Sequence, residues 1–293
     1  MLKHASGGAP LGGFRNRARL MFVVIVAIAL SLVHFDVGGL AFASPEAAGR
    51  SLPSTPKKTE AGLGGFQPGL IISDALFYDS NAMSAGEIQS FLDSKIGTCQ
   101  NGNCLNVATI VYPGRARDVS TSTGNLICDA IPAGTMRVSE LIYLAQSACG
   151  ISAKVILVTL QKEQGLILKK APSDSALRWA MGMACPDTAP CDTAAAGLGT
   201  QIVTGTRQLK VYKAAGFARQ PGTQFIYWNP NAACGGTYVN VQNYATAALY
   251  NYTPYQPNAA ALANPYGAGD GCSSYGNRNF WECFTDWFGS TTG

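Results

Sequence analysis

Helical spacing dominates the pattern of apolar positions in the central part of the chain. Residues Arg137–Cys149 are predicted to form an amphipathic helix, because four apolar residues recur on one face at intervals of three and four. These residues are Leu141, Leu144, Ala145 and Ala148. Gly150 is expected to end this helix, and Ser152 to cap the next one, which runs to Leu168. Two adjacent helices joined at a glycine are therefore expected at the centre of the fold.

Further helices are expected on both sides of this pair. Ser84-Ala85-Gly86-Glu87 has the pattern of a capping box and opens a short helix. Two more helices are predicted over about Thr200–Ala214 and Val241–Tyr250. Residues 99–131 are interrupted by Gly, Asn and Pro, which predicts a loop with at most short strands. The pattern as a whole predicts a mainly α fold.

The N-terminus has the pattern of an export signal. Three arginines precede the apolar run Leu20–Val33, and Ala41-Phe42-Ala43 supplies the small residues of a cleavage site. Because the run is short for a membrane-spanning helix, we expect cleavage after Ala43. The alternative is an uncleaved membrane anchor over residues 20–43, with the arginines on the cytoplasmic side. In either case residues 1–43 direct export, and the rest of the protein is expected to be secreted or held at the cell surface.

The exported part consists of a linker and one domain. Residues 44–67 are rich in Ser, Pro, Gly and Lys, which predicts a flexible linker. Residues 68–289 are long enough for one sizeable core and contain no internal repeat. The leader holds four of the 21 basic and one of the 17 acidic side chains, which leaves 17 against 16. The formal net charge of +4 therefore does not indicate a nucleic-acid partner, and membrane contact is expected only through the N-terminal segment.

All nine cysteines follow the leader, where disulfides are the natural expectation. Cys99–Cys104 and Cys185–Cys191 are predicted to close two short loops. For the others we prefer the pairs Cys128–Cys149 and Cys234–Cys272, although the sequence leaves other connectivities open. Cys283 then remains unpaired, either as a buried thiol or as the site of an intermolecular bridge.

Histidine is absent from the exported part of the chain. The two histidines, His4 and His34, both lie in the leader. Their position excludes Ser/His and Cys/His nucleophilic catalysis and any zinc site with a histidine ligand. Acid–base chemistry would have to be performed by Asp, Glu, Lys or Tyr. We predict no metal site and no cofactor.

Glu163 is the candidate catalytic residue. At 100° per residue it shares a helix face with Ile156, Leu160 and Ile167. A carboxyl group held among apolar side chains has a raised pKa, so it can donate a proton near neutral pH as the general acid of glycosidic cleavage does. The alternative is that Glu163 turns its carboxylate into solvent at the helix end. Lys162 would oppose the acid role if it were close, but its rotation of 100° predicts that it points elsewhere.

Two resemblances extend this interpretation. The segment ACGISAKVILVTLQKEQGLI resembles the catalytic segment of lysozyme-like lytic transglycosylases. The wider chain resembles a group of secreted proteins of Gram-positive bacteria, of the actinobacterial type, some of which have names implying haemagglutination. The shared blocks cover nearly all of residues 70–289 and are LFYDSNAMSAGEIQSFLDSK, LVTLQKEQGLI, CPDTAPCD, NAACGG, ATAALYNYTPYQPNAAAL and GNRNFWECFTDWFG. The resemblance implies a lysozyme-like helical domain with disulfide-tied loops, and peptidoglycan or another cell-wall glycan as its partner.

The resemblance to lytic transglycosylases implies a mechanism with a single carboxylate. One glutamic acid protonates the bridging oxygen of the glycan strand, and the resulting glutamate then deprotonates the C6 hydroxyl of the sugar. Glu163 would have both tasks, and Gln164 follows it where these enzymes commonly have serine. A late Tyr-Asn element lines their groove, so Tyr250 and Asn251, together with Gln164, are the candidate substrate-binding residues. Tyr252 is expected to pack in the core instead.

Simple hydrolysis of the glycan would need a second carboxylate across the bond. Asp187 and Asp192, in and just after the small disulfide loop, are the candidates, although a role in the turn is preferred for both. A non-catalytic module that binds cell-wall glycan remains the alternative to an enzyme. A Glu163 buried in a cleft would favour the enzyme, and a solvent-facing Glu163 without a cleft would favour the binding module.

Overall fold

The structure is a computed structural model that describes residues 65–186 and 189–293. The chain divides into two compact units, Met1–Glu46 and Ala47–Gly293, and every described residue belongs to the second unit. The predicted leader and almost all of the predicted linker therefore lie outside the described residues. In the part that is described, no helix has the length and the apolar character needed to cross a membrane.

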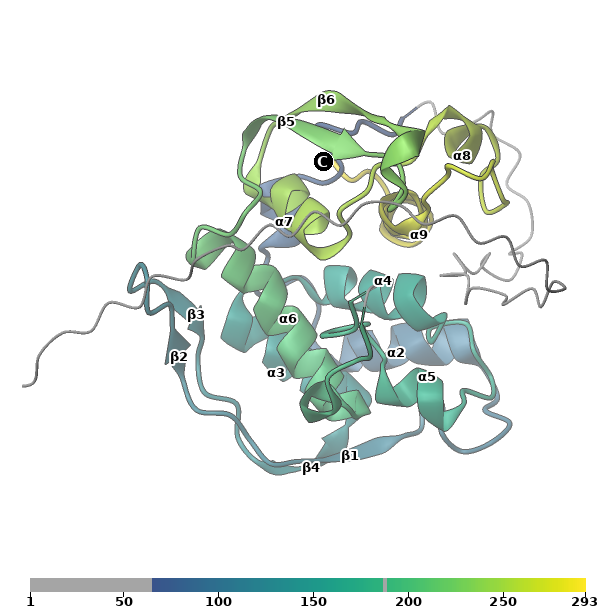
Figure 1. The fold of residues 1–293 in the computed structure, drawn as a ribbon. Coiled ribbons are helices and arrows are strands. Elements are labelled where there is room, and N and C mark those ends of the chain that lie inside the picture. Colours follow the sequence, from purple (N-terminus) through teal and green to yellow (C-terminus); the bar gives the residue numbers. More distant parts are fainter. Residues whose placement is uncertain (1–64, 187–188) are drawn as a thin grey trace, which may run out of the picture. The chain divides into compact units, whose positions relative to one another are not determined.

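Helices predominate in a mixed fold (Figure 1). The α-helices of the described residues are α1 (Asp74–Phe77), α2 (Ala85–Ile96), α3 (Val138–Cys149), α4 (Ala153–Gln164), α5 (Asp174–Arg178), α6 (Leu198–Ala214), α7 (Tyr244–Tyr252), α8 (Ala259–Ala263) and α9 (Gly276–Phe288). The strands are β1 (Thr109–Tyr112), β2 (Asp118–Val119), β3 (Leu126–Cys128), β4 (Gly134–Arg137), β5 (Gly222–Tyr227) and β6 (Gly236–Val241). Two 3₁₀ turns, η1 (Thr193–Ala195) and η2 (Ala232–Cys234), complete the set. The prediction of a mainly α fold is thus confirmed only in its coarse form, because three small sheets accompany the helices.

The predicted central pair of helices is present as α3 and α4. All side chains of α4 from Val155 to Gln161 are buried, as expected for a helix that is surrounded by protein. It packs against α3 on one side and α9 on another, and Figure 1 shows it between α9 and the helices of the lower half. Gly150 ends α3 in the left-handed conformation (φ 62°), as predicted.

The start of α4 differs from the prediction. Ser152 makes no side-chain cap, and its buried hydroxyl has no hydrogen-bond partner in the described part of the chain. The Ala153 N–H donates instead to Oε1 of Gln146, over 2.8 Å, and the Nε2 of Gln146 donates to the Met83 carbonyl. The predicted Ser152 cap is therefore wrong. The capping side chain is Gln146, which is fully buried in the last turns of α3, and the residues next to the start of α4 in the sequence do not reveal it.

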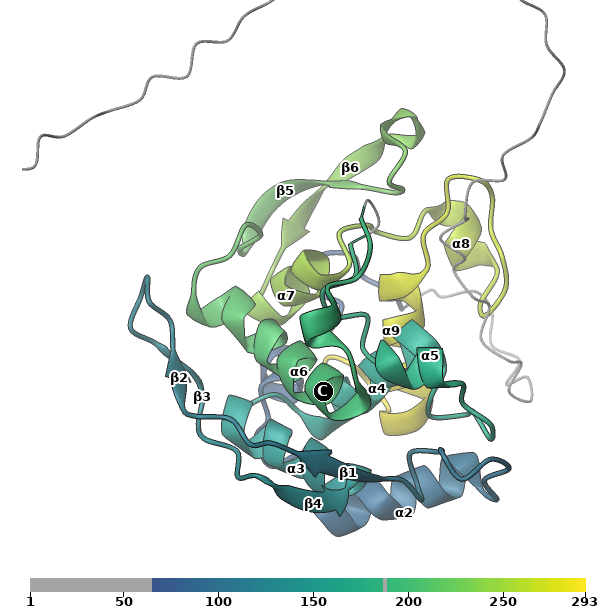
Figure 2. The same ribbon diagram turned by 60° about the horizontal axis from the view of Figure 1, so that its bottom comes forward.

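The three sheets are two-stranded and antiparallel. β1 pairs with β4, β2 with β3, and β5 with β6. The first two lie beside α3 and α6 in both Figure 1 and Figure 2, and contacts of β4 with α3 and of β1 with α6 agree with these views. The β5–β6 hairpin lies in the other half of the unit, with α7, α8 and α9.

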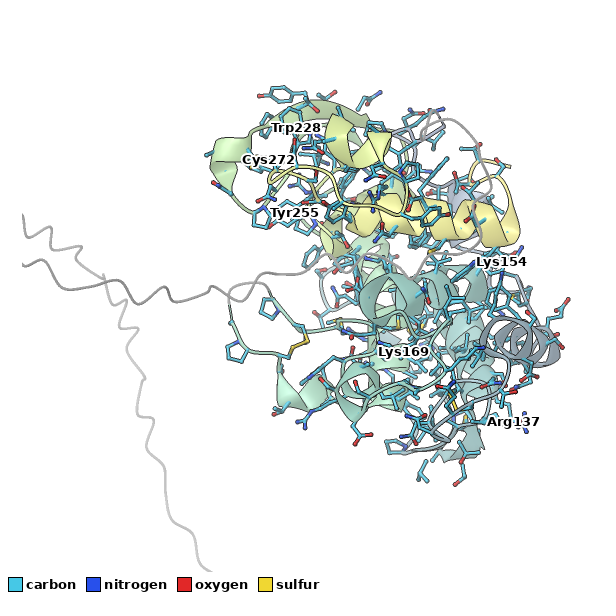
Figure 3. The ribbon with its side chains drawn as sticks, turned by 90° about the vertical axis from the view of Figure 1, so that its right-hand side faces the viewer. Arg137, Lys154, Lys169, Trp228, Tyr255 and Cys272 are labelled. Carbon is cyan, nitrogen blue, oxygen red and sulfur yellow. A yellow bond between two sulfur atoms is a disulfide. The ribbon has the colours of Figure 1, made fainter. Side chains whose placement is uncertain are left out.

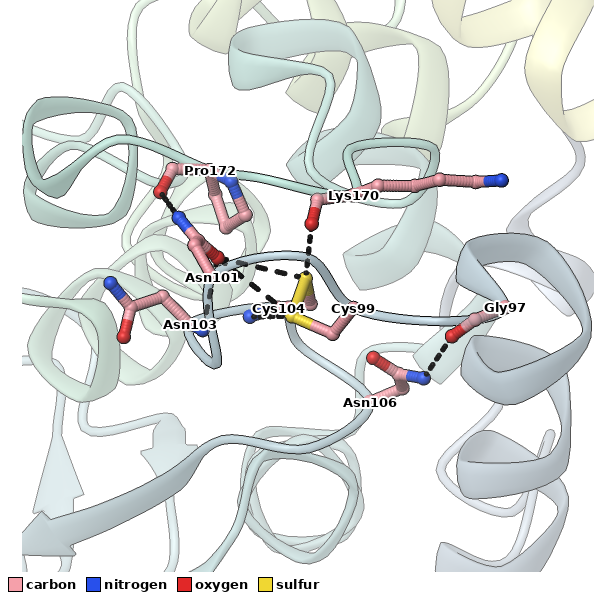
Figure 4. Close-up of a disulfide and its surroundings, with 8 residues drawn as sticks. All are labelled: Gly97, Cys99, Asn101, Asn103, Cys104, Asn106, Lys170 and Pro172. Carbon is pink, nitrogen blue, oxygen red and sulfur yellow. Dashed lines mark hydrogen bonds between the residues drawn. A yellow bond between two sulfur atoms is a disulfide. The ribbon is translucent and has the colours of Figure 1, made fainter.

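The four disulfides are those that were preferred from the sequence. They join Cys99 to Cys104, Cys128 to Cys149, Cys185 to Cys191 and Cys234 to Cys272. Cys283 is a free, buried cysteine. The Cys99–Cys104 loop is tied to the segment that follows α4 (Figure 4). There Asn101 donates to the Pro172 carbonyl over 2.8 Å, and the Gln100 N–H donates to the Lys170 carbonyl over 2.7 Å.

Candidate functional site

Glu163 lies in the last turn of α4, where the buried helix reaches the surface. Gly165 ends the helix in the left-handed conformation (φ 67°), and its N–H bonds to the Gln161 and Leu160 carbonyls. The chain then reverses, because Oε1 of Gln161 accepts hydrogen bonds from the backbone N–H groups of Ile167 and Leu168. The helix therefore stops four residues earlier than predicted. Ile167 is buried after this reversal and does not belong to the helix face that was expected to surround Glu163.

The Glu163 side chain is 26% exposed and forms an ion pair with Lys162. The distance from Lys162 Nζ to Glu163 Oε1 is 2.6 Å, so the expectation that Lys162 points elsewhere is wrong. Lys162 itself is buried, with 2% of its side chain exposed. Its ammonium also donates to Thr253 Oγ1 over 2.7 Å and lies 5.0 Å from the centre of the Tyr252 ring. A hydroxyl, a carboxylate and an aromatic face together compensate the buried charge.

The carboxylate rests against the loop that follows α5. A Cβ placed on Gly182 would lie 2.8 Å from Glu163 Oε2, and Gly182 has a positive φ of 67°. Glycine alone meets both conditions without strain. Gln201 of α6 fixes this loop, because its Oε1 accepts from the Met181 and Met183 N–H groups and its Nε2 donates to the Met183 carbonyl.

Tyr252 connects the same loop to α7. Its hydroxyl donates to the Met181 carbonyl over 2.5 Å. Burial, with a further contribution from the negative charge of Glu163 and from Tyr212, holds the pKa of the Tyr252 phenol well above its ordinary value. The phenol therefore stays protonated and acts as a donor. Three chain segments, at the end of α4, at Gly182 and at Tyr252–Thr253, thus meet around the carboxylate.

Only one oxygen of the carboxylate is engaged within the described residues. Oε1 takes the Lys162 contact, whereas Oε2 accepts no hydrogen bond from any residue that the structure describes. An anchored carboxylate with one unpaired oxygen is able to accept a hydrogen bond from a hydroxyl of a ligand, or to exchange a proton with that hydroxyl.

The structure does not bring the predicted Tyr-Asn element to Glu163. Tyr250 is fully buried, its hydroxyl donates to the Pro68 carbonyl over 2.9 Å, and burial raises the pKa of its phenol. The Asn251 side chain binds the backbone of Arg219, accepting from its N–H and donating to its carbonyl, both over 2.9 Å. Gln164 is partly buried, and its backbone carbonyl accepts a hydrogen bond from the Lys169 ammonium. Tyr250 and Asn251 therefore have structural roles in this structure.

The residues that do meet Glu163 were not all recognisable in the sequence. The sequence predicts that Lys162 points elsewhere and that Tyr252 packs in the core, and it carries no signal for Thr253 or Gly182. Successive residues of α7 differ by 100°, so the ring of Tyr250 and that of Tyr252 point in widely different directions.

The structure describes only one of the two candidate second carboxylates, Asp192. Asp187 lies outside the described residues. Asp192 is exposed and caps η1, with its Oδ1 accepting from the Ala194 N–H over 2.9 Å, which is the turn role that was preferred for it. Within residues 65–186 and 189–293, no group of three His, Cys, Asp or Glu side chains is placed to hold a metal ion.

A cavity of about 360 Å³ lies elsewhere, between β1 and the start of α6. Its lining includes Ile110 and Tyr112 on the strand and Gly199 on the helix, and does not include Glu163. The structure therefore shows Glu163 at a partly exposed polar cluster rather than at the base of this cavity.

Comparison of the chain with protein-family models, with curated proteins and with solved structures finds no match.

Proposed function

We propose that this protein is exported and cleaves the glycan strand of peptidoglycan, with Glu163 as its acid and base. A lysozyme-like domain is part of the proposal. The observation that carries it is the state of the Glu163 carboxylate, which is anchored through Oε1, backed by a glycine, and unpaired at Oε2 among the residues that the structure describes. The sequence segment around it resembles that of lytic transglycosylases, whose reaction needs one such carboxylate.

The reaction has two proton transfers that one oxygen can perform in turn. Oε2 donates a proton to the bridging oxygen as the glycosidic bond breaks, and the resulting carboxylate accepts the proton of the C6 hydroxyl as the anhydro ring closes. Water is not a reactant, so no second carboxylate is required. The positive charge of Lys162, 2.6 Å from Oε1, favours the carboxylate form of Glu163, which assists the departure of the proton but opposes the protonated form that the first step requires. The same contact holds the head group in one orientation between the two steps.

Export is supported by the leader pattern and by the four disulfides, which persist in oxidising compartments. The proposed location is the cell surface or the medium, with membrane attachment through residues 20–43 if the leader is retained. Cell-wall glycan would be the first polymer that such a protein meets.

A second candidate function is a non-catalytic, lectin-like or haemagglutinin-like module that binds cell-wall glycan. The Lys162–Glu163 ion pair favours it, because an ammonium and a carboxylate side by side offer a donor and an acceptor to sugar hydroxyls without any proton transfer. The partial exposure of Glu163, outside the cavity beside β1, also suits binding.

One experiment separates the two functions. Purified protein is incubated with peptidoglycan, and the soluble sugars are analysed by mass spectrometry, with anhydro ends marking a transglycosylase. Glu163→Gln keeps the shape of the side chain but cannot transfer the proton, so we expect it to fold, to bind the wall and to lose cleavage by roughly 10²–10⁴-fold. Glu140→Gln is the matched control, because Glu140 is exposed and a glutamine can keep its capping hydrogen bond from the Arg137 N–H, so this variant should cleave normally. Normal cleavage by Glu163→Gln would refute the assignment, and wall binding without any cleavage by the wild type would establish the binding module.

A further inference from the structure

The β5–β6 hairpin has one apolar face buried in the domain and one aromatic face turned to solvent. Ile226, Val239 and Val241 on the inner face are buried. Phe225 and Tyr227 alternate with Ile226 along β5, and Phe225 stands opposite Tyr238 of β6. The exposed fractions of the outward side chains are 37% for Phe225, 41% for Tyr227 and 76% for Tyr238. These three residues are called the aromatic cluster below.

The rings of the aromatic cluster are already ordered relative to one another. The centre of the Phe225 ring lies 5.0 Å from that of Tyr227 and 5.3 Å from that of Tyr238, with interplanar angles of 82° and 75°. The register places Gly236 opposite Tyr227, and a Cβ at Gly236 would lie 2.3 Å from the Ile226 carbonyl oxygen. No side chain can therefore stand at Gly236 to cover the Tyr227 ring from across the hairpin.

Cross-strand aromatic contacts stabilise a hairpin, but they do not require the large exposure of Tyr238. An ordered group of exposed rings typically marks a binding surface. The two strands, GTQFIY and GTYVNV, contain no charged residue, and their outward polar groups are the hydroxyls of the tyrosines and of Thr223 and the amide of Asn240. Arg219 contacts β5, donating to the Gln224 side chain and to the Phe225 carbonyl. One arginine held in this way does not make the basic surface that a nucleic acid or an anionic membrane would need. Sugar rings, with apolar C–H faces and hydroxyl rims, match aromatic faces with polar edges.

The aromatic cluster is also connected to the Glu163 site by a short, fixed segment. Tyr227 forms a parallel bridge with Tyr255, and the Gln256 N–H donates to the Tyr227 carbonyl over 3.0 Å. Two residues before Tyr255, Thr253 receives the hydrogen bond of Lys162. Asn277 at the start of α9 fixes the segment by donating to the Thr253 carbonyl over 2.9 Å and to the Tyr255 carbonyl over 2.8 Å.

Figure 3 shows Tyr255 and Trp228, which directly follows β5, on the same side of the half that contains α7–α9.

We propose that the aromatic cluster of Phe225, Tyr227 and Tyr238 is a second glycan-binding site, which holds an uncharged polysaccharide by stacking against its sugar rings. The identity of the polymer as the glycan of peptidoglycan rests on the proposed function. The site itself does not depend on cleavage.

The test measures binding to two insoluble polymers by co-sedimentation. Peptidoglycan stripped of attached polymers is the first, and chitin, an uncharged β-linked polymer of N-acetylglucosamine, is the second. Tyr238→Ala should raise the Kd for both by roughly tenfold, equivalent to the loss of one well-placed contact. Tyr238→Trp should restore binding, because it returns a larger ring to the same place. Tyr143→Ala removes a tyrosine that is 38% exposed on α3 and should bind as the wild type does.

Salt and cleavage provide the remaining controls. Binding through stacking should change little between low and high salt, whereas binding through charge would weaken steeply. Binding is measured separately from cleavage, so a wild type that binds both polymers without releasing sugar still supports this site. Unchanged binding by folded Tyr238→Ala would overturn the second site. Absence of glycan binding in the wild type, combined with self-association that Tyr238→Ala abolishes, would overturn it in favour of a protein-docking surface.

Discussion

Glu282 on α9 offers the sharpest test of the electrostatics of this fold. Its side chain is 1% exposed, and its Oε2 atom has no hydrogen-bond partner within the described residues. Burial raises the pKa of Glu282 from 4.5 to about 7. Arg278, whose Nε lies 3.5 Å from Oε1, and the Tyr266 N–H act in the opposite direction, and the charge of Asp286 adds to the increase.

The raised pKa determines the sign of the pH dependence. Between pH 4.5 and 7 the folded protein holds a proton on Glu282 that the unfolded chain has lost, so stability falls as the pH rises through this window and then levels off. A shift from 4.5 to about 7, at about 1.4 kcal/mol per unit, corresponds to a loss of about 3 kcal/mol in the free energy of unfolding. The loss is the cost of ionising a carboxyl group that has little access to water.

Glu282→Gln removes this cost and keeps the shape of the side chain. Arg278 keeps its other partners in the variant, because its Nη1 donates to the carbonyls of Ala261, Asn264 and Gly267. The variant should match the wild type near pH 4.5 and exceed it by about 3 kcal/mol above pH 8. Urea unfolding from pH 4.5 to 8, with the disulfides intact, measures the free energy of unfolding of both proteins. Subtracting the wild-type value from that of the variant at each pH removes the contribution of all other titrating groups. A difference that is constant with pH, or a variant less stable at pH 8, would show that the Arg278–Glu282 pair stabilises the fold and that this reasoning is wrong.

Two further predictions concern the Glu163 site and the cysteines. Gly182→Ala should cost at least about 1–2 kcal/mol of stability from its positive φ and should also displace Glu163 and reduce cleavage, whereas Gly165→Ala, with a similar φ and no atom near its Cβ, should cost only stability. Melting and cleavage assays are run on the two variants in parallel, and an equal loss of cleavage activity in both would contradict the prediction. A thiol reagent should find no reactive cysteine in the native protein and one after unfolding, because Cys283 is buried and burial raises its pKa. A disulfide-linked dimer on a non-reducing gel would contradict it.

Local rules account for the parts of the fold that were predicted correctly. The capping box of Ser84 and Glu87 opens α2, since both of its hydrogen bonds join residues three positions apart. The periodicity of α3 and its terminal Gly150 likewise depend on neighbouring residues. The cysteines of the Cys99–Cys104 and Cys185–Cys191 loops are only five and six residues apart, so closing these loops costs little chain entropy. The β5–β6 hairpin was not predicted, because its 3₁₀ turn and disulfide interrupt the simple two-residue loop pattern.

The sequence by itself determined which residues are able to perform chemistry, and the tertiary structure decided which of them meet. The restriction of histidine to residues 4 and 34 and the single glutamate at the end of a buried helix follow from the order of residues alone. The ion pair of Lys162 with Glu163 does not, because a rotation of 100° separates their Cα–Cβ directions while their long side chains converge on the same point. The contact of Gly182 with Glu163 and that of Thr253 with Lys162 do not follow from it either, because they depend on how α4, α6 and α7 pack. Helix periodicity specifies a direction within one element, and only packing between elements specifies what lies in that direction.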